Sequence, residues 1–294
     1  MPESEVQSVS SVWLPGECVA SSVAGDVSGE RVTEDTGDVL VEQATIPEVT
    51  PDGTVPVACR ICGGATRLAP IHDVWSEPGF RFWRCLDCGT ETSDRDYTRA
   101  DYDCNHRDDY FIECLGSWEA VLDQLNTNVW LFEKNMTLAG NSFLDVGYCD
   151  GAMLQRMHRK ECRCVGFDVF GHKAAKIAAR AGIDMGCLFH GKGLEDTALV
   201  NYTFNLIHCR EVIEHVPDPA QLMRTMASML NPGGLLQVQT PTPCGLDSRI
   251  PYQLQHLTLI APQMLRAMGL SCGLRIVETL YWPQGQCVVF RKPC

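Results

Sequence analysis

The chain has 294 residues, and 45% of them are hydrophobic, which is enough to build one large domain and a smaller module. No apolar run reaches the ~18 residues that a transmembrane helix needs, and the first residues, MPESEVQSVSS, lack the basic and apolar regions of a signal peptide. Of the net charge of −13, all but −3 lies in residues 1–52, so the remainder lacks the basic surface that non-specific nucleic-acid binding requires. We therefore expect a cytoplasmic protein that does not bind membrane, and the charge distribution argues against nucleic acid as a partner.

Residues 1–52 carry eleven acidic residues and one basic residue, with no sustained helical or alternating period. This composition predicts a disordered acidic tail. The stretch DVLVEQATIPEV could form a strand on a partner, but a solvated tail is the favoured interpretation. The sequence identifies no protein partner for it.

Two C-x-x-C pairs, CRIC (59–62) and CLDC (85–88), stand out among the sixteen cysteines. A long chain without an export signal favours reduced thiols over disulfides, and four sulfurs from two pairs suit tetrahedral Zn²⁺. We predict a zinc-ribbon-like module over residues 53–108 that holds a structural zinc ion through Cys59, Cys62, Cys85 and Cys88. A remnant with four free thiols is the alternative. The segment GFRFWRC within the module is expected to be a strand.

Residues 109–140 place apolar side chains at steps of three and four, which predicts one or two amphipathic helices that connect the module to the rest of the chain. The apolar positions are Phe111, Leu115, Trp118, Val121, Leu122, Leu125, Val129 and Phe132.

Residues 141–294 alternate between apolar strand-like runs and helical stretches, which predicts an α/β domain with a parallel sheet covered on both faces. The expected strands are 142–146, 162–168, 183–189, 204–209, 234–240, 274–280 and 285–291. The expected helices are 151–160, 171–181, 218–230 and 261–270, while 191–201 is ambiguous.

The stretch FLDVGYCDGAML (143–154) reads as a strand, a glycine turn and a helix, which offers backbone N–H groups at the helix start. A second acid, Asp168, ends the next expected strand, 23 residues after Asp145. An acid at about that distance commonly holds ribose hydroxyls. Two acids suit a ligand rich in hydroxyl and ammonium donors, whereas Asp150 inside the turn would repel a diphosphate. We also expect Asp150 to cap the helix.

With the segment REVIEHVPDP (210–219) and the P-G-G turn at 232–234, the chain resembles class I S-adenosylmethionine-dependent methyltransferases over residues 141–291. The resemblance implies a Rossmann-like, mostly parallel seven-stranded sheet with helices on both faces and an antiparallel last strand. It implies methyl transfer from S-adenosylmethionine. The implied cofactor-binding residues are Asp145, Gly147, Tyr148, Asp150, Gly151, Asp168 and Val169.

The family usually has a glycine where this chain has Cys149. A cysteine fits if the backbone keeps a negative φ; if the turn needs a positive φ, cofactor affinity should fall. A non-catalytic scaffold that binds a protein partner is the alternative that this residue keeps open.

Glu211, Glu214 and His215 lie within five residues, and on a helical turn they would share one face. Two carboxylates and an imidazole suit Mg²⁺, Mn²⁺ or Zn²⁺. The E-x-x-E-H pattern resembles metal-using O-methyltransferases of ubiquinone biosynthesis and enzymes that methylate the 2′-hydroxyl at small-RNA ends, which implies His256 as a further ligand. Alternatively, Glu214 and His215 brace the loop, or His215 acts as a general base, a role that His208 could also fill.

The expected acceptor is a small molecule: a sugar, a phenol or a natural-product intermediate methylated on oxygen or carbon. The zinc module resembles those that precede some C-methyltransferases of deoxysugar pathways. An RNA-end 2′-O-methyltransferase is the rival enzyme.

Overall fold

The computed structural model describes residues 55–73, 81–95, 115–171, 173–244, 252–253 and 255–294. The expected acidic tail and the first part of the expected connector lie outside the described residues. Among the described residues, no helix combines the length and apolar character that crossing a bilayer would demand.

A seven-stranded sheet in the order β10-β11-β8-β7-β4-β5-β6 forms the centre of the large domain. Strands β4 to β8 pair in parallel, while β11 is antiparallel to both of its neighbours, β8 and β10. This confirms the predicted α/β class and the antiparallel last strand. The strands are β4 (Ser142–Val146), β5 (Arg163–Asp168), β6 (Leu188–His190), β7 (Phe204–Arg210), β8 (Leu230–Pro241), β10 (Arg275–Trp282) and β11 (Gly285–Arg291).

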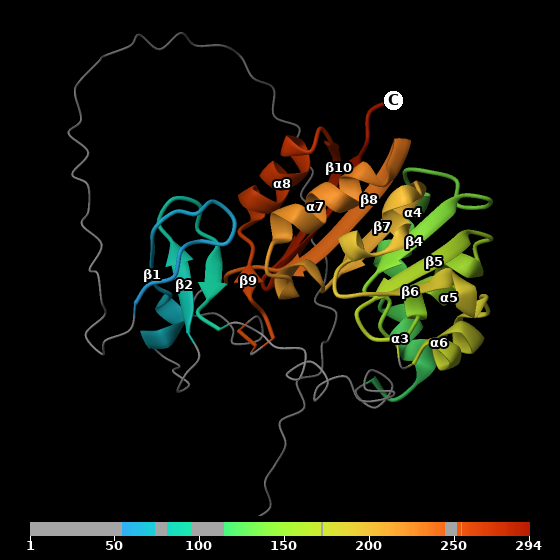
Figure 1. Ribbon diagram of the computed structural model, residues 1–294, viewed down its shortest axis with the longest axis horizontal. Helices are drawn as coiled ribbons and strands as arrows, with labels where there is room; N and C mark the ends of the chain where they lie inside the picture. Colours follow the sequence, from blue (N-terminus) through green and yellow to red (C-terminus); the bar gives the residue numbers. More distant parts are fainter. Residues whose placement is uncertain (1–54, 74–80, 96–114, 172, 245–251, 254) are drawn as a thin grey trace, which may run out of the picture.

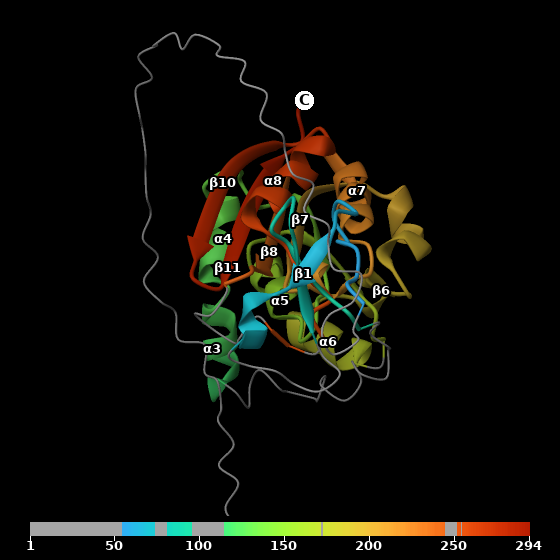
Figure 2. The ribbon, with the colours of Figure 1, turned by 90° about the vertical axis from the view of Figure 1, so that its left-hand side faces the viewer.

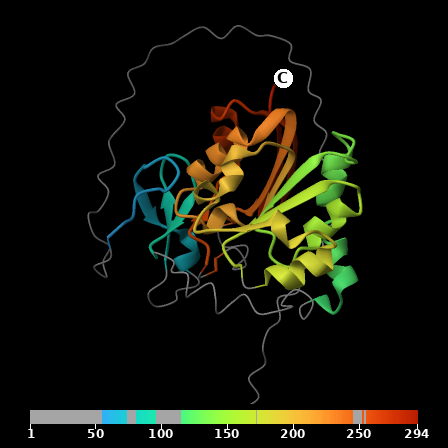
Figure 3. The same ribbon diagram turned by 45° about the vertical axis from the view of Figure 1, so that its right-hand side comes forward.

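Helices cover both faces of this sheet, each over its own apolar cluster (Figure 3). One face packs against α3 (Trp118–Asp123), α4 (Asn126–Glu133), α5 (Ala152–His158) and α6 (Ala174–Ala181). The other face packs against α7 (Pro219–Ser228) and α8 (Pro262–Ser271). Near-continuous apolar strands are the reason, because a strand buried on both sides has no polar face.

Three local expectations differ from the structure. The strand expected at 183–189 is shortened to β6, because Asp184 accepts a hydrogen bond from the Gly186 amide at 2.6 Å and starts a 3₁₀ turn, η2 (Met185–Cys187). The ambiguous stretch 191–201 forms two further 3₁₀ turns, η3 (Leu194–Asp196) and η4 (Ala198–Asn201). Asp150 does not cap α5, because Gly151 occupies the N-cap position at φ 77°.

The cysteine-bearing module forms a second, antiparallel sheet in the order β1-β2-β3-β9, next to a 3₁₀ turn, η1 (Pro70–Asp73). Its own strands are β1 (Thr66–Leu68), β2 (Phe82–Cys85) and β3 (Glu91–Ser93), so the strand expected in GFRFWRC is present as β2. The fourth strand, β9 (Thr258–Leu259), comes from the far end of the chain and reaches over from the large domain (Figure 1). Viewed from the module's side, the small sheet lies in front of the large one (Figure 2).

Candidate functional site

The carboxyl ends of β4, β5 and β7 lie at one edge of the large sheet, because these neighbouring strands are parallel. The loops that follow them carry the glycine turn, Asp168 and the acid–histidine segment. Ligands of open α/β sheets bind at this edge.

The turn after β4 uses the left-handed backbone region three times: at Gly147 (φ 77°), Cys149 (φ 45°) and Gly151 (φ 77°). A Cβ on Gly147 would lie 2.2 Å from Cγ2 of Val212, so this position also requires glycine for the close approach of the loop after β7. The turn therefore keeps the tight form of a cofactor cradle, with a strained cysteine inside it.

Asp168 lies at the end of β5 and fixes the turn. Its carboxylate accepts hydrogen bonds from the Cys149 amide and the Phe170 amide, each at 3.0 Å. A carboxylate has about four lone-pair positions, so a carboxylate that orders a turn can also accept from ligand hydroxyls. The half-buried Asp168 thus fits the role of a ribose-binding acid.

The remaining residues of the expected cofactor set lie around the turn in different environments. The Tyr148 ring is buried beneath the turn, and its hydroxyl contacts Nε2 of His190 at the end of β6. Asp150 is buried, and Val169 is half-buried against the apolar cluster under α7 and α8. Only the backbone of Tyr148 therefore faces the turn, because its side chain belongs to the core.

Asp145 and His208 are direct partners on adjacent strands, and both side chains are buried. Nδ1 of His208 lies 2.8 Å from Oδ1 of Asp145. A direct pair places two side chains on the same face of a sheet, so these two groups meet inside the large sheet. His208 is thus held against the turn's first acid instead of standing exposed at the strand end.

Burial raises the pKa of the Cys149 thiol well above its usual value, and the charges of Asp150 and Asp168 raise it further. The side chain is therefore a neutral thiol. Cys149 affects the turn through the strain of its backbone at positive φ.

Replacing Cys149 with glycine should raise the free energy of unfolding by about 1 kcal/mol, since glycine adopts a positive φ without strain. The affinity for S-adenosylmethionine should be unchanged or tighter. Thermal denaturation and calorimetry measure both quantities. Cys187→Gly is the matched control: Cys187 lies in η2 without a positive φ, so this change should destabilise the protein. A loss of stability in Cys149→Gly would contradict the prediction.

Glu214, His215 and His256 form the second cluster, with one ligand atom from each lying within 4.8 Å of the others. Glu214 and His215 lie in the 3₁₀ turn η5 (Ile213–His215), and His256 precedes β9. The two imidazole rings meet edge to face at 4.8 Å. The sequence predicted this meeting through resemblance, and the structure places these three residues together.

Glu214 is completely buried, and its two oxygens differ. Oε2 accepts a hydrogen bond from Oγ1 of Thr240 at 2.9 Å, whereas Oε1 has no hydrogen-bond partner among the described residues and lies 3.8 Å from Nε2 of His215. Burial raises the pKa of Glu214 well above its usual value, and the nearby charge of Glu211 adds to this. A cation or a proton beside Oε1 would relieve both effects.

His215 is oriented by the main chain. Its Nδ1 lies 2.8 Å from the carbonyl oxygen of Gln255, so Nδ1–H donates and Nε2 keeps its lone pair in the neutral ring. Histidines that bind metals usually donate their other N–H in this way. The geometry therefore suits either a cation or a proton at Nε2.

Glu211 lies outside this group of three. Its backbone adopts φ 52°, and its Oε1 accepts a hydrogen bond from Nε2 of Gln239 at 3.1 Å. Glu211 precedes the short 3₁₀ turn η5, and its carboxyl remains close to that of Glu214, whose pKa it helps to raise. Sequence reasoning missed Thr240 and Gln239, whose only signal is their place at the end of a strand next to β7.

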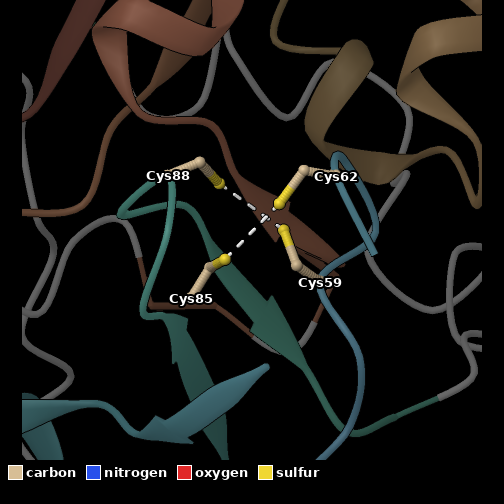
Figure 4. A group of neighbouring side chains, drawn as sticks. All are labelled: Cys59, Cys62, Cys85 and Cys88. Carbon is tan, nitrogen blue, oxygen red and sulfur yellow. Dashed lines mark hydrogen bonds between the residues drawn. The ribbon is translucent and has the colours of Figure 1, made fainter. Parts of the chain in front are cut away.

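The four cysteines of the module converge from two loops (Figure 4). The Sγ atoms of Cys59 and Cys88 lie 3.6 Å apart and those of Cys62 and Cys85 3.5 Å apart. Four sulfurs at ~2.3 Å from a tetrahedral Zn²⁺ would lie about 3.8 Å apart, so the arrangement has the size of a zinc site.

The electrostatics of the four thiols also suit a cation. Burial raises the pKa of Cys59 to about 12. Burial alone would also raise the pKa of Cys85, but the backbone amides of Cys88 and Asp87 donate to its sulfur and lower the pKa below its usual value. Thiolates packed this closely need a positive ion between them.

Comparisons with known proteins place this site in context. A family model described as "Methyltransferase domain" matches residues 111–279, more than half of the chain. The ubiquinone biosynthesis O-methyltransferase of Aeromonas salmonicida is 27% identical over 114 residues, which cover 38% of this chain and 48% of that protein. The enzyme of the same name from Marinobacter nauticus is 32% identical over 113 residues, covering 37% and 47%. The chain spans about half the length of the curated relatives it matches.

Among solved structures, an S-adenosylmethionine-dependent methyltransferase from Archaeoglobus fulgidus is similar with a TM-score of 0.50 and 15% identity. The match covers 62% of this chain and 98% of that one. At this identity the likeness shows a shared fold.

Proposed function

The chain belongs to the methyltransferase-domain family, and from this premise we propose that it transfers a methyl group from S-adenosylmethionine to a hydroxyl of a small-molecule acceptor. The observation that carries the choice of acceptor is Oε1 of Glu214. It is a buried carboxylate oxygen without a hydrogen-bond partner among the described residues, facing His215 at the edge where the glycine turn lies.

The cofactor would be held by the turn after β4 and by Asp168, with Asp145, Gly147 and Gly151 shaping the cradle and Tyr148, Asp150 and Val169 supporting it. S-adenosylmethionine supplies an already activated methyl group when bound. The chain's task is then to align the acceptor oxygen with that methyl group and to exclude water.

Glu214, His215 and His256 would act on the acceptor hydroxyl in one of two ways. In the first, they hold a divalent ion such as Mg²⁺ or Mn²⁺, with Glu211 nearby, and the ion when bound lowers the pKa of the hydroxyl. In the second, Nε2 of His215 accepts the proton directly. His208 is a less suitable base, because its ring is buried within the large sheet beside Asp145.

Support for an oxygen acceptor comes from the relatives, which are named as O-methyltransferases of ubiquinone biosynthesis. A phenolic hydroxyl is therefore the first substrate class to test, followed by sugar hydroxyls and by carbon acceptors. The rival RNA-end activity is an outcome of the same screen, which incubates the protein with methyl-labelled cofactor and pools of phenols, sugars and short RNAs. Transfer to RNA alone would overturn the small-molecule proposal.

We further propose that Cys59, Cys62, Cys85 and Cys88 hold one structural Zn²⁺, since four thiolate ligands leave no open coordination position for substrate. On this proposal, residues 53–108 form the zinc module, 109–140 the connector and 141–294 the methyltransferase domain, after a tail over 1–52.

Replacing Asp168 with alanine should weaken S-adenosylmethionine binding by about 1–3 kcal/mol, the cost of losing a hydrogen-bond partner at a partly buried site. Isothermal calorimetry measures the change. Asp123→Ala, which removes an exposed carboxylate from α3, is the matched control and should bind normally. Wild-type protein that fails to bind millimolar cofactor would refute the cofactor assignment.

A further inference from the structure

The segment formed by residues 252–253 and 255–263 contacts both parts of the molecule, because it carries His256 and supplies β9 to the small sheet. We propose that the four-cysteine module is the support that positions His256, and with it the geometry of the Glu214–His215–His256 cluster. The positioning residues for this cluster would then be Thr90, Glu91 and Ser93 of the module, together with Tyr252. None of them touches the cluster itself.

Main-chain pairing fixes the strand in register. Glu91 pairs with Leu259 and Thr92 with Thr258, and the Ser93 amide donates to the Leu257 carbonyl at 2.9 Å. The last of these bonds falls on the residue immediately after His256. A shift of β3 would therefore be transmitted to His256 through a single residue.

Side chains secure the segment at both ends. At its start, the rings of Tyr252 and Phe82 meet edge to face at 5.1 Å, and the buried Glu91 lies beside them, paired with Arg84. This contact anchors the segment before His256.

After His256, Oγ1 of Thr90 accepts from the Ala261 amide at 3.2 Å, and Nε2 of Gln263 donates to the Cys88 carbonyl at 2.8 Å. Cys88 is itself one of the four clustered cysteines, so the segment bonds directly to the main chain of the cysteine cluster.

On its opposite side, the same segment bonds to the acid–histidine turn. The Leu257 amide donates to the Glu214 carbonyl at 2.8 Å, and the Gln255 carbonyl accepts from Nδ1 of His215 at 2.8 Å. Leu257 thus uses its N–H toward the cluster and its C=O toward the module. The segment therefore lies between the module on one side and the acid–histidine turn on the other.

The large sheet also holds this segment beyond β9, where Nε2 of Gln286 donates to the Ile260 carbonyl at 3.0 Å. This bond lies beyond β9, whereas the module's contacts at Tyr252, Leu257, Thr258 and Leu259 lie on both sides of His256. Loss of the module's support should therefore displace His256 and leave Ile260 attached.

The expected effect on catalysis rests on the proposed function of the Glu214–His215–His256 cluster. The position of His256, in contrast, can be measured without an activity assay. The probe is the imidazole ¹⁵N spectrum of protein labelled at its eight histidines, with signals assigned by single His→Gln variants. His190 and His208 lie on β6 and β7 and serve as internal references.

In Cys62→Ser, which removes the most exposed of the four thiols, zinc should be lost and the signals of His215 and His256 should shift or broaden. The signals of His190 and His208 should stay in place. Cys294→Ser, an exposed cysteine outside the cluster, should change neither zinc content nor spectrum. Spectra with and without Mg²⁺ separate the module's effect from that of an ion at the cluster.

Unmoved His215 and His256 signals in the zinc-free variant would overturn the proposal. If the signals of His190 and His208 also broaden or disappear, the zinc-free variant is unfolded, and Thr90→Val is the variant that tests the proposal. It keeps all four cysteines and removes only the acceptor for the Ala261 amide. With zinc retained, His256 should shift in Thr90→Val, and an unchanged spectrum there also overturns the proposal. Shifted signals with undiminished turnover would uphold the positioning and refute the catalytic role of the cluster.

Discussion

Glu214→Gln should lower the turnover number by about 10²- to 10⁴-fold, the usual contribution of a group that assists proton removal. Glutamine has nearly the same volume and can still accept the hydrogen bond from Thr240, so the change removes the ionisable proton and little else. Cofactor affinity should stay within about twofold, because Glu214 lies on the acceptor side. Steady-state kinetics and calorimetry separate these quantities.

The same substitution should raise stability at neutral pH while it lowers activity. The folded protein holds the pKa of Glu214 well above its unfolded value, chiefly through burial. An acid with a raised folded pKa favours folding below its unfolded pKa, and this stability is lost as the pH rises toward the folded pKa. A neutral glutamine avoids that loss, so the melting temperature of Glu214→Gln should exceed that of the wild type above pH 5 in the absence of a divalent ion.

Chelation distinguishes the two versions of the cluster. If it holds Mg²⁺ or Mn²⁺, a chelator should abolish activity and either ion should restore it, while the tightly held zinc stays in place. If His215 is the base, activity should resist the chelator. Glu214→Gln with full turnover would exclude both versions and leave the cluster as a brace for the loop.

Cys85→Ser should remove the zinc and unfold the module, since structural zinc sites contribute about 10–16 kcal/mol of apparent binding free energy in small zinc-finger peptides. Elemental analysis should give one zinc per wild-type chain and none in the variant. Limited proteolysis should cut the variant within residues 55–95 and leave the large domain intact. Cys187→Ser, a half-buried cysteine outside the module, is the control.

Zinc content unchanged in Cys85→Ser would refute the four-thiolate assignment. A wild-type protein that contains no zinc when purified without chelator would do so as well.

The strands of the large sheet and the helices between them were predictable because each is marked by a pattern within its own stretch of sequence. Each of β4, β5 and β7 is a short apolar run, and the helices between the strands repeat their apolar residues at helical spacing. The pairing of β9 with β3 was not predictable in this way. Two residues, Thr258 and Leu259, carry no strand signal of their own, and their partner lies more than 160 positions earlier in the chain.

The site was predictable in its location and less so in its internal contacts. Acids and glycines at strand ends indicated one edge of the sheet, and Glu214, His215 and His256 do meet there. That Glu211 stays outside the group of three depends on a positive φ that no pattern of residue types reveals. The pairing of His208 with Asp145 depends on the register between two strands, which follows from the fold as a whole. The roles of all these residues stay predictions.

Because β9 pairs with β3 of the module, no truncation between the module and the large domain leaves the large domain with all of its main-chain partners. A fragment starting at residue 115 would leave the Leu257 carbonyl and the β3-facing main-chain groups of Thr258 and Leu259 in water, and would expose the buried surfaces of Tyr252 and Leu259. An unpaired strand beside apolar side chains is a template for pairing with another molecule. Such a fragment should self-associate as concentration rises, and a soluble, monomeric fragment is best sought by keeping residues 55–95 attached.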